Sequence, residues 1–138
     1  MDLEKKDEFD LLLACVLGEA EGEPVFGKLA VACVVRNRVL DSRWPDTYKD
    51  VLLQPFQFSC FLPAFLRPDI FERRYNDPVW RECKASAFVV YHNWYQDVTN
   101  GANHYYSMIA LDEPPSWAEG EHPVFSMGGH SFFKLYTT

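Results

Sequence analysis

The sequence contains few positive charges and no long apolar run. Its 138 residues include 13 Lys and Arg against 20 Asp and Glu, which gives a net charge of −7. Because proteins bind nucleic acids by neutralising phosphates with basic side chains, this balance argues against a nucleic-acid partner. The apolar stretch after the charged N-terminus is short and is broken by Glu19, Glu21 and Glu23. It therefore predicts neither membrane insertion nor a secretory signal, and we expect synthesis in the cytoplasm without a signal peptide.

Motifs for several kinds of chemistry are also missing. The sequence has no G-x-S-x-G, no Walker loop and no dinucleotide fingerprint, so it predicts no cofactor. It has no C-x-x-C pair and no H-E-x-x-H, so we predict no metal, although a zinc site could still form by convergence of histidines in space. The histidines are His92, His104, His122 and His130. The cysteines are scattered, and Cys15 and Cys33, in apolar stretches, are expected to be reduced core thiols.

The composition is that of a globular protein. Hydrophobic residues make up 48% and charged residues 24% of the chain, and aromatic residues reach 16%. Such a chain can bury a sizeable core, and this many aromatic rings can fill the core and still line a groove. We find no internal repeat, linker or low-complexity segment, so we expect residues 1–138 to form a single domain.

Hydrophobic periodicity predicts a mainly helical first part. Apolar spacing predicts a helix over residues 7–20 and a second, nearly all buried, over 24–40, with Pro24 in its first turn. Prolines keep residues 41–76 irregular, apart from a short helix at 48–53. A third helix is expected over 77–95, with Asp77 as its cap and Trp94 on its inner face.

The C-terminal part changes character. Residues 104–108 alternate as a strand does, so Tyr105 and Tyr106 should face opposite sides of it. Residues 124–127 and 130–133 are typical of a hairpin closed by Gly128-Gly129. The prediction is an α+β fold, a helical body with a small antiparallel sheet in its C-terminal part.

Glu19 is the residue that most suggests chemistry. It sits about 60° from Val16 on an ideal helix, at the edge of the apolar face. The negative end of the helix dipole, partial burial and the neighbouring Glu21 and Glu23 all disfavour its anion. A carboxyl group kept protonated near neutral pH is what a general acid for glycosidic cleavage requires. The simpler interpretation is a solvated acidic loop without a role.

Two further segments offer weaker candidates. Gln57-Phe58-Ser59, in a proline-bounded loop, could present an amide and a hydroxyl to a ligand, or could be a turn around a buried Phe58. His104-Tyr105-Tyr106 combines rings with hydrogen-bonding groups, which suits sugars, although core packing is the commoner use of tyrosine.

These residues resemble a known family. The stretch 17–24, followed by Gly27, residues 30–32 and 37–39, is similar to the start of the spore cortex-lytic (SleB-like) cell-wall hydrolase family. The likeness continues at 54–55, 57–59, 102–106, Trp117 and 129–132. Residues 60–76 match no pattern of the family, and Ser107-Met108 stands where Asn-Pro is common.

The resemblance implies a lysozyme-like fold that cuts peptidoglycan glycan strands, with Glu19 as the catalytic acid. It further implies a lytic transglycosylase that cleaves between N-acetylmuramic acid and N-acetylglucosamine. The substrate-binding residues that follow from it are Glu23, Gln57, Ser59, His104, Tyr105 and Tyr106. An unsignalled hydrolase of this kind resembles a phage endolysin held in the host cytoplasm, or part of a virion-associated lytic protein; we expect a monomer.

Three alternatives stay open. A hydrolytic muramidase would use Glu23 as a second carboxylate. A metal-dependent amidase or peptidase would use the histidines. A non-catalytic glycan-binding domain would need neither.

Overall fold

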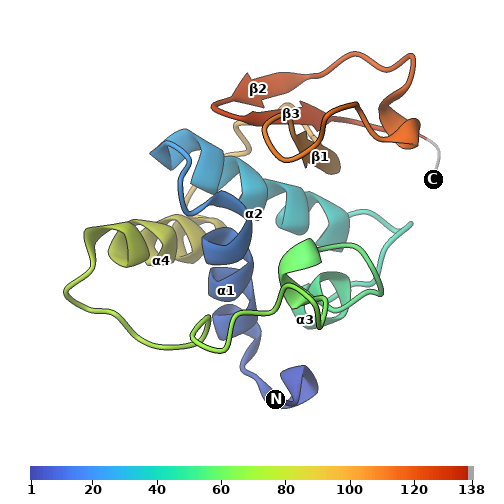
Figure 1. Ribbon diagram of the computed structural model, residues 1–138. Coiled ribbons are helices and arrows are strands. Elements are labelled where there is room, and N and C mark those ends of the chain that lie inside the picture. The colour runs from blue at the N-terminus through green and yellow to red at the C-terminus, as the bar shows by residue number, and fades with distance from the viewer. Residues whose placement is uncertain (137–138) are drawn as a thin grey trace.

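The computed structural model describes residues 1–136, in which a helical body precedes a small sheet (Figure 1). The α-helices are α1 (Glu8–Ala20), α2 (Val25–Val39), α3 (Tyr48–Leu52) and α4 (Pro78–Tyr91). The 3₁₀ turns are η1 (Leu3–Lys5), η2 (Ser59–Phe61) and η3 (Ser116–Ala118), and the strands are β1 (His104–Ser107), β2 (Phe125–Met127) and β3 (His130–Phe133). This order confirms the predicted α+β class.

Helix α1 is the central helix of the body. The Asp7 carboxylate caps it by accepting the backbone N–H groups of Phe9 and Asp10. All residues from 11 to 17 are buried, because α2, α3, α4 and η2 pack around the helix. A helix that is apolar on every side is stable only when it is enclosed in this way. Glu19 therefore lies where the buried helix reaches the surface.

The sheet has the strand order β1-β3-β2 and is antiparallel throughout. Gly128, with φ of +58°, makes the tight turn between β2 and β3, as the hairpin pattern predicts. Tyr105 lies opposite Phe132, and Tyr106 lies opposite Ser131, so the two tyrosines point to opposite faces. The sheet lies over α2, on the side of the molecule away from the N-terminus (Figure 1).

Helix α4 ends earlier than its sequence pattern predicts. The expected helix over 77–95 stops at Tyr91, because Asn93 adopts a left-handed φ of +58°. The N–H groups of Asn93 and Trp94 then bond back to the carbonyls of Val90 and Val89, the arrangement of a Schellman cap. Trp94 is 71% exposed, so its predicted place on the inner face of this helix was wrong.

The cysteines lie in the core, as expected from the sequence. Cys15, Cys33, Cys60 and Cys83 are all buried and unbridged, which confirms the core thiols expected at Cys15 and Cys33. Burial raises the pKa of Cys33 to about 11. Among residues 1–136, no helix combines the length and the apolar character needed to cross a bilayer.

Candidate active site

The Glu19 carboxylate, in the last turn of α1, is held by two hydroxyl groups from distant parts of the chain. The Ser59 hydroxyl donates to one oxygen over 3.1 Å, and the Tyr105 hydroxyl donates to the other over 2.9 Å. The end of a helix, a loop and a strand thus meet at one carboxylate. Three of the residues selected from the sequence are brought together here.

Ser59 reaches Glu19 because η2 packs directly on α1. Phe58 and Cys60 on either side of it are buried, whereas Ser59 is exposed. A Cβ atom at Gly18 would lie 2.5 Å from the Cβ of Cys60, so the close approach of the two segments requires glycine. The glycine before Glu19 therefore sets the position of the Ser59 hydroxyl.

Tyr105 reaches Glu19 from the face of the sheet that packs on the helices. Its ring centroid lies 5.5 Å from that of Phe132 and 5.3 Å from that of His130. Burial raises the pKa of Tyr105 well above its ordinary value, and the adjacent Glu19 carboxylate raises it further. The Tyr105 hydroxyl therefore keeps its proton and remains a hydrogen-bond donor over the whole neutral range.

Arg38 at the end of α2 holds the loop and the strand in register. Its Nε donates to the carbonyl of Asn103 over 2.7 Å, and its guanidinium donates to the Gln57 side chain over 3.1 Å. The guanidinium lies between the rings of Trp44 and Phe58, at 5.4 Å from each centroid. Arg38 is buried, and it fixes residues two positions before both Ser59 and Tyr105.

Asn37 adds a parallel contact, since its amide donates to the Ala102 carbonyl over 2.9 Å. In the sequence, Asn37 and Arg38 stand out only as part of the family resemblance. Their positions at the end of an otherwise buried helix could have indicated their positioning role. A buried arginine must be paired, so Arg38 had to have partners in other segments.

The Glu23 side chain points away from Glu19, toward the turn between β2 and β3. Its carboxylate accepts the backbone N–H of Gly129 over 3.1 Å and contacts Nδ1 of His130. A Cβ atom at Gly128 would overlap the same carboxylate. Glu23 therefore ties the start of α2 to the β2–β3 turn, and it shares none of the partners of Glu19 among the described residues.

The other predicted substrate-binding residues lie on the outer side. His104 and Tyr106 project from the face of β1 opposite to Tyr105. Tyr106 stacks on Phe133 at 5.7 Å, within a small cluster that includes Trp117. His104 lies between Trp44 and Trp117, at centroid distances of 6.0 and 5.0 Å. Gln57, bonded to Arg38, lies at the border between this region and Ser59.

No grouping of three or more His, Cys, Asp or Glu side chains within residues 1–136 is close enough to hold a metal ion. The four histidines do not converge into a ligand set in this part of the chain.

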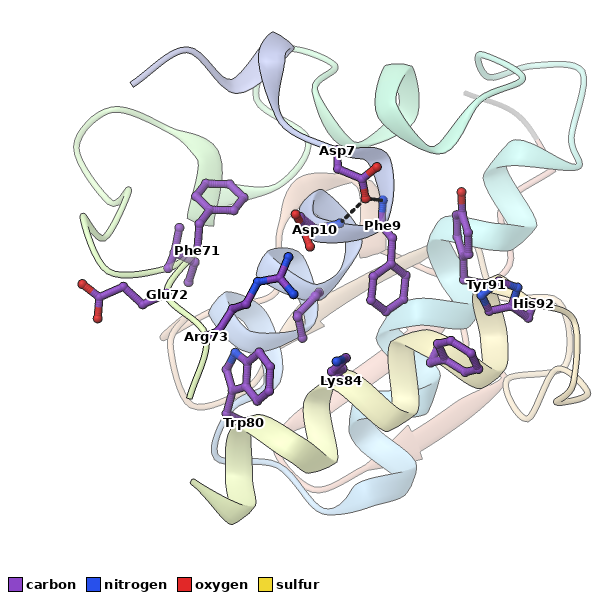
Figure 2. Close-up of a pocket in the computed structure, with 13 residues that line it drawn as sticks. Asp7, Phe9, Asp10, Phe71, Glu72, Arg73, Trp80, Lys84, Tyr91 and His92 are labelled. Atoms are coloured by element: carbon purple, nitrogen blue, oxygen red, sulfur yellow. Dashed lines mark hydrogen bonds between the residues drawn. The ribbon is translucent and has the colours of Figure 1, made fainter. Parts of the chain in front are cut away.

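A hollow of about 570 Å³ lies at the other end of α1 (Figure 2). Phe9, Trp80, Phe71 and Lys84 are among its lining residues, and Figure 2 shows Asp7 at its edge, bonded to the first turn of α1. None of the predicted catalytic or substrate-binding residues lines it, and its capping carboxylate is committed to the helix. The chemistry points instead to the opposite end, at Glu19.

The chain combines a helical body and a small C-terminal sheet with a carboxylate at the end of a buried helix. Residues 22–133 match the model of the family described as Cell Wall Hydrolase, and the chain belongs to this family. The match begins just after Glu19, so the assignment of the family does not depend on that residue. The predicted family and the predicted lysozyme-like fold are confirmed.

The chain is similar to several spore cortex-lytic enzymes. That of Bacillus cereus is 25% identical over 131 residues, which is 94% of this chain and 45% of the relative. That of Bacillus subtilis (strain 168) is 27% identical over 128 residues, 91% of this chain and 37% of the relative. The chain therefore spans less than half the length of these curated relatives.

Two solved structures match nearly end to end. The crystal structure of the catalytic domain of the Bacillus cereus SleB protein has a TM-score of 0.72 at 25% identity, covering 92% of this chain and 89% of that one. The catalytic domain of the germination-specific lytic transglycosylase SleB from Bacillus anthracis has a TM-score of 0.72 at 24% identity, covering 92% and 93%, and shows the same fold.

Proposed function

We propose that this chain degrades peptidoglycan as a lytic transglycosylase, with Glu19 as general acid and then general base. The observation that carries the proposal is the carboxylate at the end of a buried helix, bonded by Ser59 and Tyr105, in a member of the cell wall hydrolase family. The description of the Bacillus anthracis relative as a lytic transglycosylase supports the choice of reaction.

In the first step, the Glu19 carboxyl donates its proton to the glycosidic oxygen of the N-acetylglucosamine leaving group. The bond from that oxygen to C1 of N-acetylmuramic acid breaks, and positive charge develops at C1. In the second step, the 6-hydroxyl oxygen of the same muramoyl unit attacks C1, and its proton passes to Glu19. The product is a 1,6-anhydro ring, no water is consumed, and Glu19 is protonated again.

The hydrogen-bond partners of Glu19 suit a residue that first loses and then regains a proton. A hydroxyl group can donate to a carboxylate and can rotate to accept from a carboxylic acid. Ser59, which is exposed, has this freedom, while Tyr105 is held by packing and stays a donor. Glu19 thus keeps its orientation in both protonation states, as a residue that acts twice in one turnover requires.

Glu23 supports a mechanism with one carboxylate. A retaining hydrolase needs a second carboxylate free to attack or to stabilise C1. The Glu23 oxygens already accept from Gly129 and contact His130, so we assign it to positioning the β2–β3 turn. Ser59 and Tyr105 are proposed to contact the substrate as well as Glu19, with Gln57 at the border of the groove.

The decisive experiment replaces Glu19 by Gln. The amide keeps the shape and cannot donate the required proton, so clearing of wall suspensions should fall by about 10²- to 10⁴-fold, the usual range for a general acid. Glu21→Gln is the matched control, because Glu21 pairs with Arg67 on the surface over 2.6 Å. Clearing that survives Glu19→Gln would remove Glu19 from the mechanism.

Mass spectrometry of the released muropeptides identifies the reaction. Anhydro products are expected, and products heavier by one water would show a hydrolytic muramidase instead. Activity that is lost with EDTA and restored by zinc would favour the metal-dependent amidase or peptidase. Retained glycan binding without any cleavage by the unaltered chain would indicate a binding domain.

We also propose that residues 1–138 act as one catalytic unit and as a monomer on the glycan strands. Light scattering at the concentrations used for wall clearing would show the mass of a single 16.0 kDa chain. A dimer that persists on dilution would contradict this part of the proposal.

A further inference from the structure

A hollow of about 550 Å³ opens beside Gln57, where the loop after α2 meets the outer face of β1. Its walls include the rings of Trp44, Trp117 and His104. Gln57 and Ser59 are two residues apart, so their Cα atoms are at most about 7 Å from each other. The hollow therefore begins beside the loop that carries Ser59, and its volume is ample for a sugar ring.

The proton on His104 can be located from its neighbours. The Asn103 amide donates to the Leu135 carbonyl over 2.9 Å, and its Oδ1 accepts the Leu135 N–H over 2.9 Å. These two bonds run in opposite directions, so they fix which atom of the amide is oxygen. His104 Nδ1 lies 2.8 Å from this Oδ1, which can only accept. Nδ1 therefore carries the hydrogen, and the neutral ring leaves Nε2 as an acceptor.

The ring also stays neutral under ordinary conditions. Burial, together with the nearby cations Arg38 and Arg43, lowers the pKa of His104 to about 4. Nε2 thus keeps its lone pair, and no described residue donates to it.

The other groups around the hollow are mostly uncharged or already paired. Arg43 forms an ion pair with Asp41 over 2.8 Å and packs its guanidinium 4.9 Å from the centre of the Trp44 ring. The Gln57 oxygen accepts from Arg38, which leaves the amide N–H groups of Gln57 to donate elsewhere. Glu121, at the exposed rim, is the lining carboxylate.

We propose that this hollow is a subsite for an N-acetylglucosamine unit of the glycan strand, in which His104 Nε2 accepts a hydrogen bond from a sugar hydroxyl or acetamido N–H. The indole rings of Trp44 and Trp117 contact the apolar face of the sugar, and the Gln57 amide donates to it. We assign the hollow to N-acetylglucosamine, the unit of the strand that carries no peptide. The described lining residues include no unpaired cation that could bind the carboxylates of a peptide. The assignment rests on the proposed function, whose reaction takes place at Glu19.

His104→Phe tests the subsite, since the new ring can fill the space between the two indoles but has no acceptor. Loss of one hydrogen bond to substrate predicts a rise in KM of about three- to tenfold, with kcat within about twofold. The substrate is a peptide-free oligosaccharide of alternating N-acetylglucosamine and N-acetylmuramic acid. The same exchange at the exposed His122 is the control and should leave both constants unchanged.

A second measurement separates recognition from a purely structural role. In protein carrying Glu19→Gln, the ring nitrogens of His104 are followed by NMR as the same oligosaccharide is added. The Nε2 resonance should move on saturation, together with the indole signals of Trp44 and Trp117. An unmoved Nε2 resonance, with shifts confined to Tyr105, overturns the subsite and leaves the proposed function standing. If neither wall clearing by the unaltered chain nor oligosaccharide binding is seen, the proposed function itself fails.

Discussion

At the scale of single residues, the Tyr105 hydroxyl is the neighbour on which Glu19 should depend most. It donates over 2.9 Å, and packing of its ring on Phe132 leaves it little freedom to turn away. Tyr105→Phe keeps the ring and removes this donor. A hydrogen bond to a charged group is worth about 1.5–3 kcal/mol, so kcat for wall clearing should fall by about 10- to 100-fold.

The control for this exchange is Tyr136→Phe, which removes a hydroxyl from an exposed ring. Its clearing rate should equal that of the unaltered chain. Equal rates for Tyr105→Phe would mean that the hydroxyl does not orient the catalytic carboxyl.

His104 should make the free energy of unfolding depend on pH. Its pKa in the folded chain is about 4, against 6.5 for an ordinary histidine, chiefly because it is buried. Only the unfolded chain takes up this proton between these values, so the free energy of unfolding should decrease as the pH falls from about 6.5 to about 4, by at most about 1.4 kcal/mol per pH unit. Above pH 6.5 this contribution is constant.

Urea unfolding at several pH values measures this slope. His104→Phe should flatten it in the same window, while the carboxylates that titrate in both proteins cancel in the comparison. Parallel curves for the two proteins would show that His104 is not held neutral by the fold.

At this scale the sequence indicated the position of Glu19 at the end of its helix better than it indicated the contacts around Glu19. The end of a helical apolar pattern located Glu19, and strand alternation predicted that Tyr105 and Tyr106 would separate. Their roles came from a resemblance, and which tyrosine faces Glu19 depends on how the sheet packs on α2. The bonds of Arg38 to Asn103 and Gln57 join positions 65 and 19 residues away, which no local pattern contains.

At the scale of elements, the packing of η2 on α1 brings Ser59 to Glu19. A substitution at Gly18 tests the importance of this packing. Gly18→Ala places a Cβ 2.5 Å from the Cβ of Cys60, so η2 and its Ser59 must shift. Overpacking of this kind costs about 1–3 kcal/mol, and the displaced Ser59 should also slow wall clearing. Urea unfolding and clearing rates measure the two effects.

Gly22→Ala is the matched control. Nothing lies within 4 Å of its added Cβ, so its stability should be unchanged or slightly raised. Gly18→Ala with the stability of Gly22→Ala would show that the two segments are less closely packed than described.

Element boundaries could be predicted where a local signal exists. Asp77 and Pro78 gave the start of α4, and Gly128-Gly129 gave the hairpin turn, since caps and turns are local chemistry. The end of α4 was missed because apolar spacing continues to Trp94. Asn93, which ends the helix in a left-handed conformation, is a weaker stop signal than glycine, so the apolar spacing outweighed it.

At the scale of the whole molecule, net charge should govern how fast the chain works on its polymer. The chain carries −7, and the proposed substrate bears carboxylates on its peptides. Salt screens this repulsion, with a Debye length of about 8 Å at 0.15 M. The rate of wall clearing should therefore rise as sodium chloride is added from low ionic strength to about that concentration.

The neutral His104 provides an internal comparison. The effect of His104→Phe on KM should be the same at low and moderate salt. Clearing that falls steadily from the lowest salt onward would mean that local positive groups dominate the encounter.

The Glu19 carboxylate and its two hydroxyl partners come from residues 19, 59 and 105, and the strand that carries Tyr105 pairs with residues 130–133. The ribosome must therefore pass residue 133 before these groups can meet in the folded arrangement. Products that terminate before residue 130, and proteolytic fragments that lack β3, should therefore be inert in wall clearing.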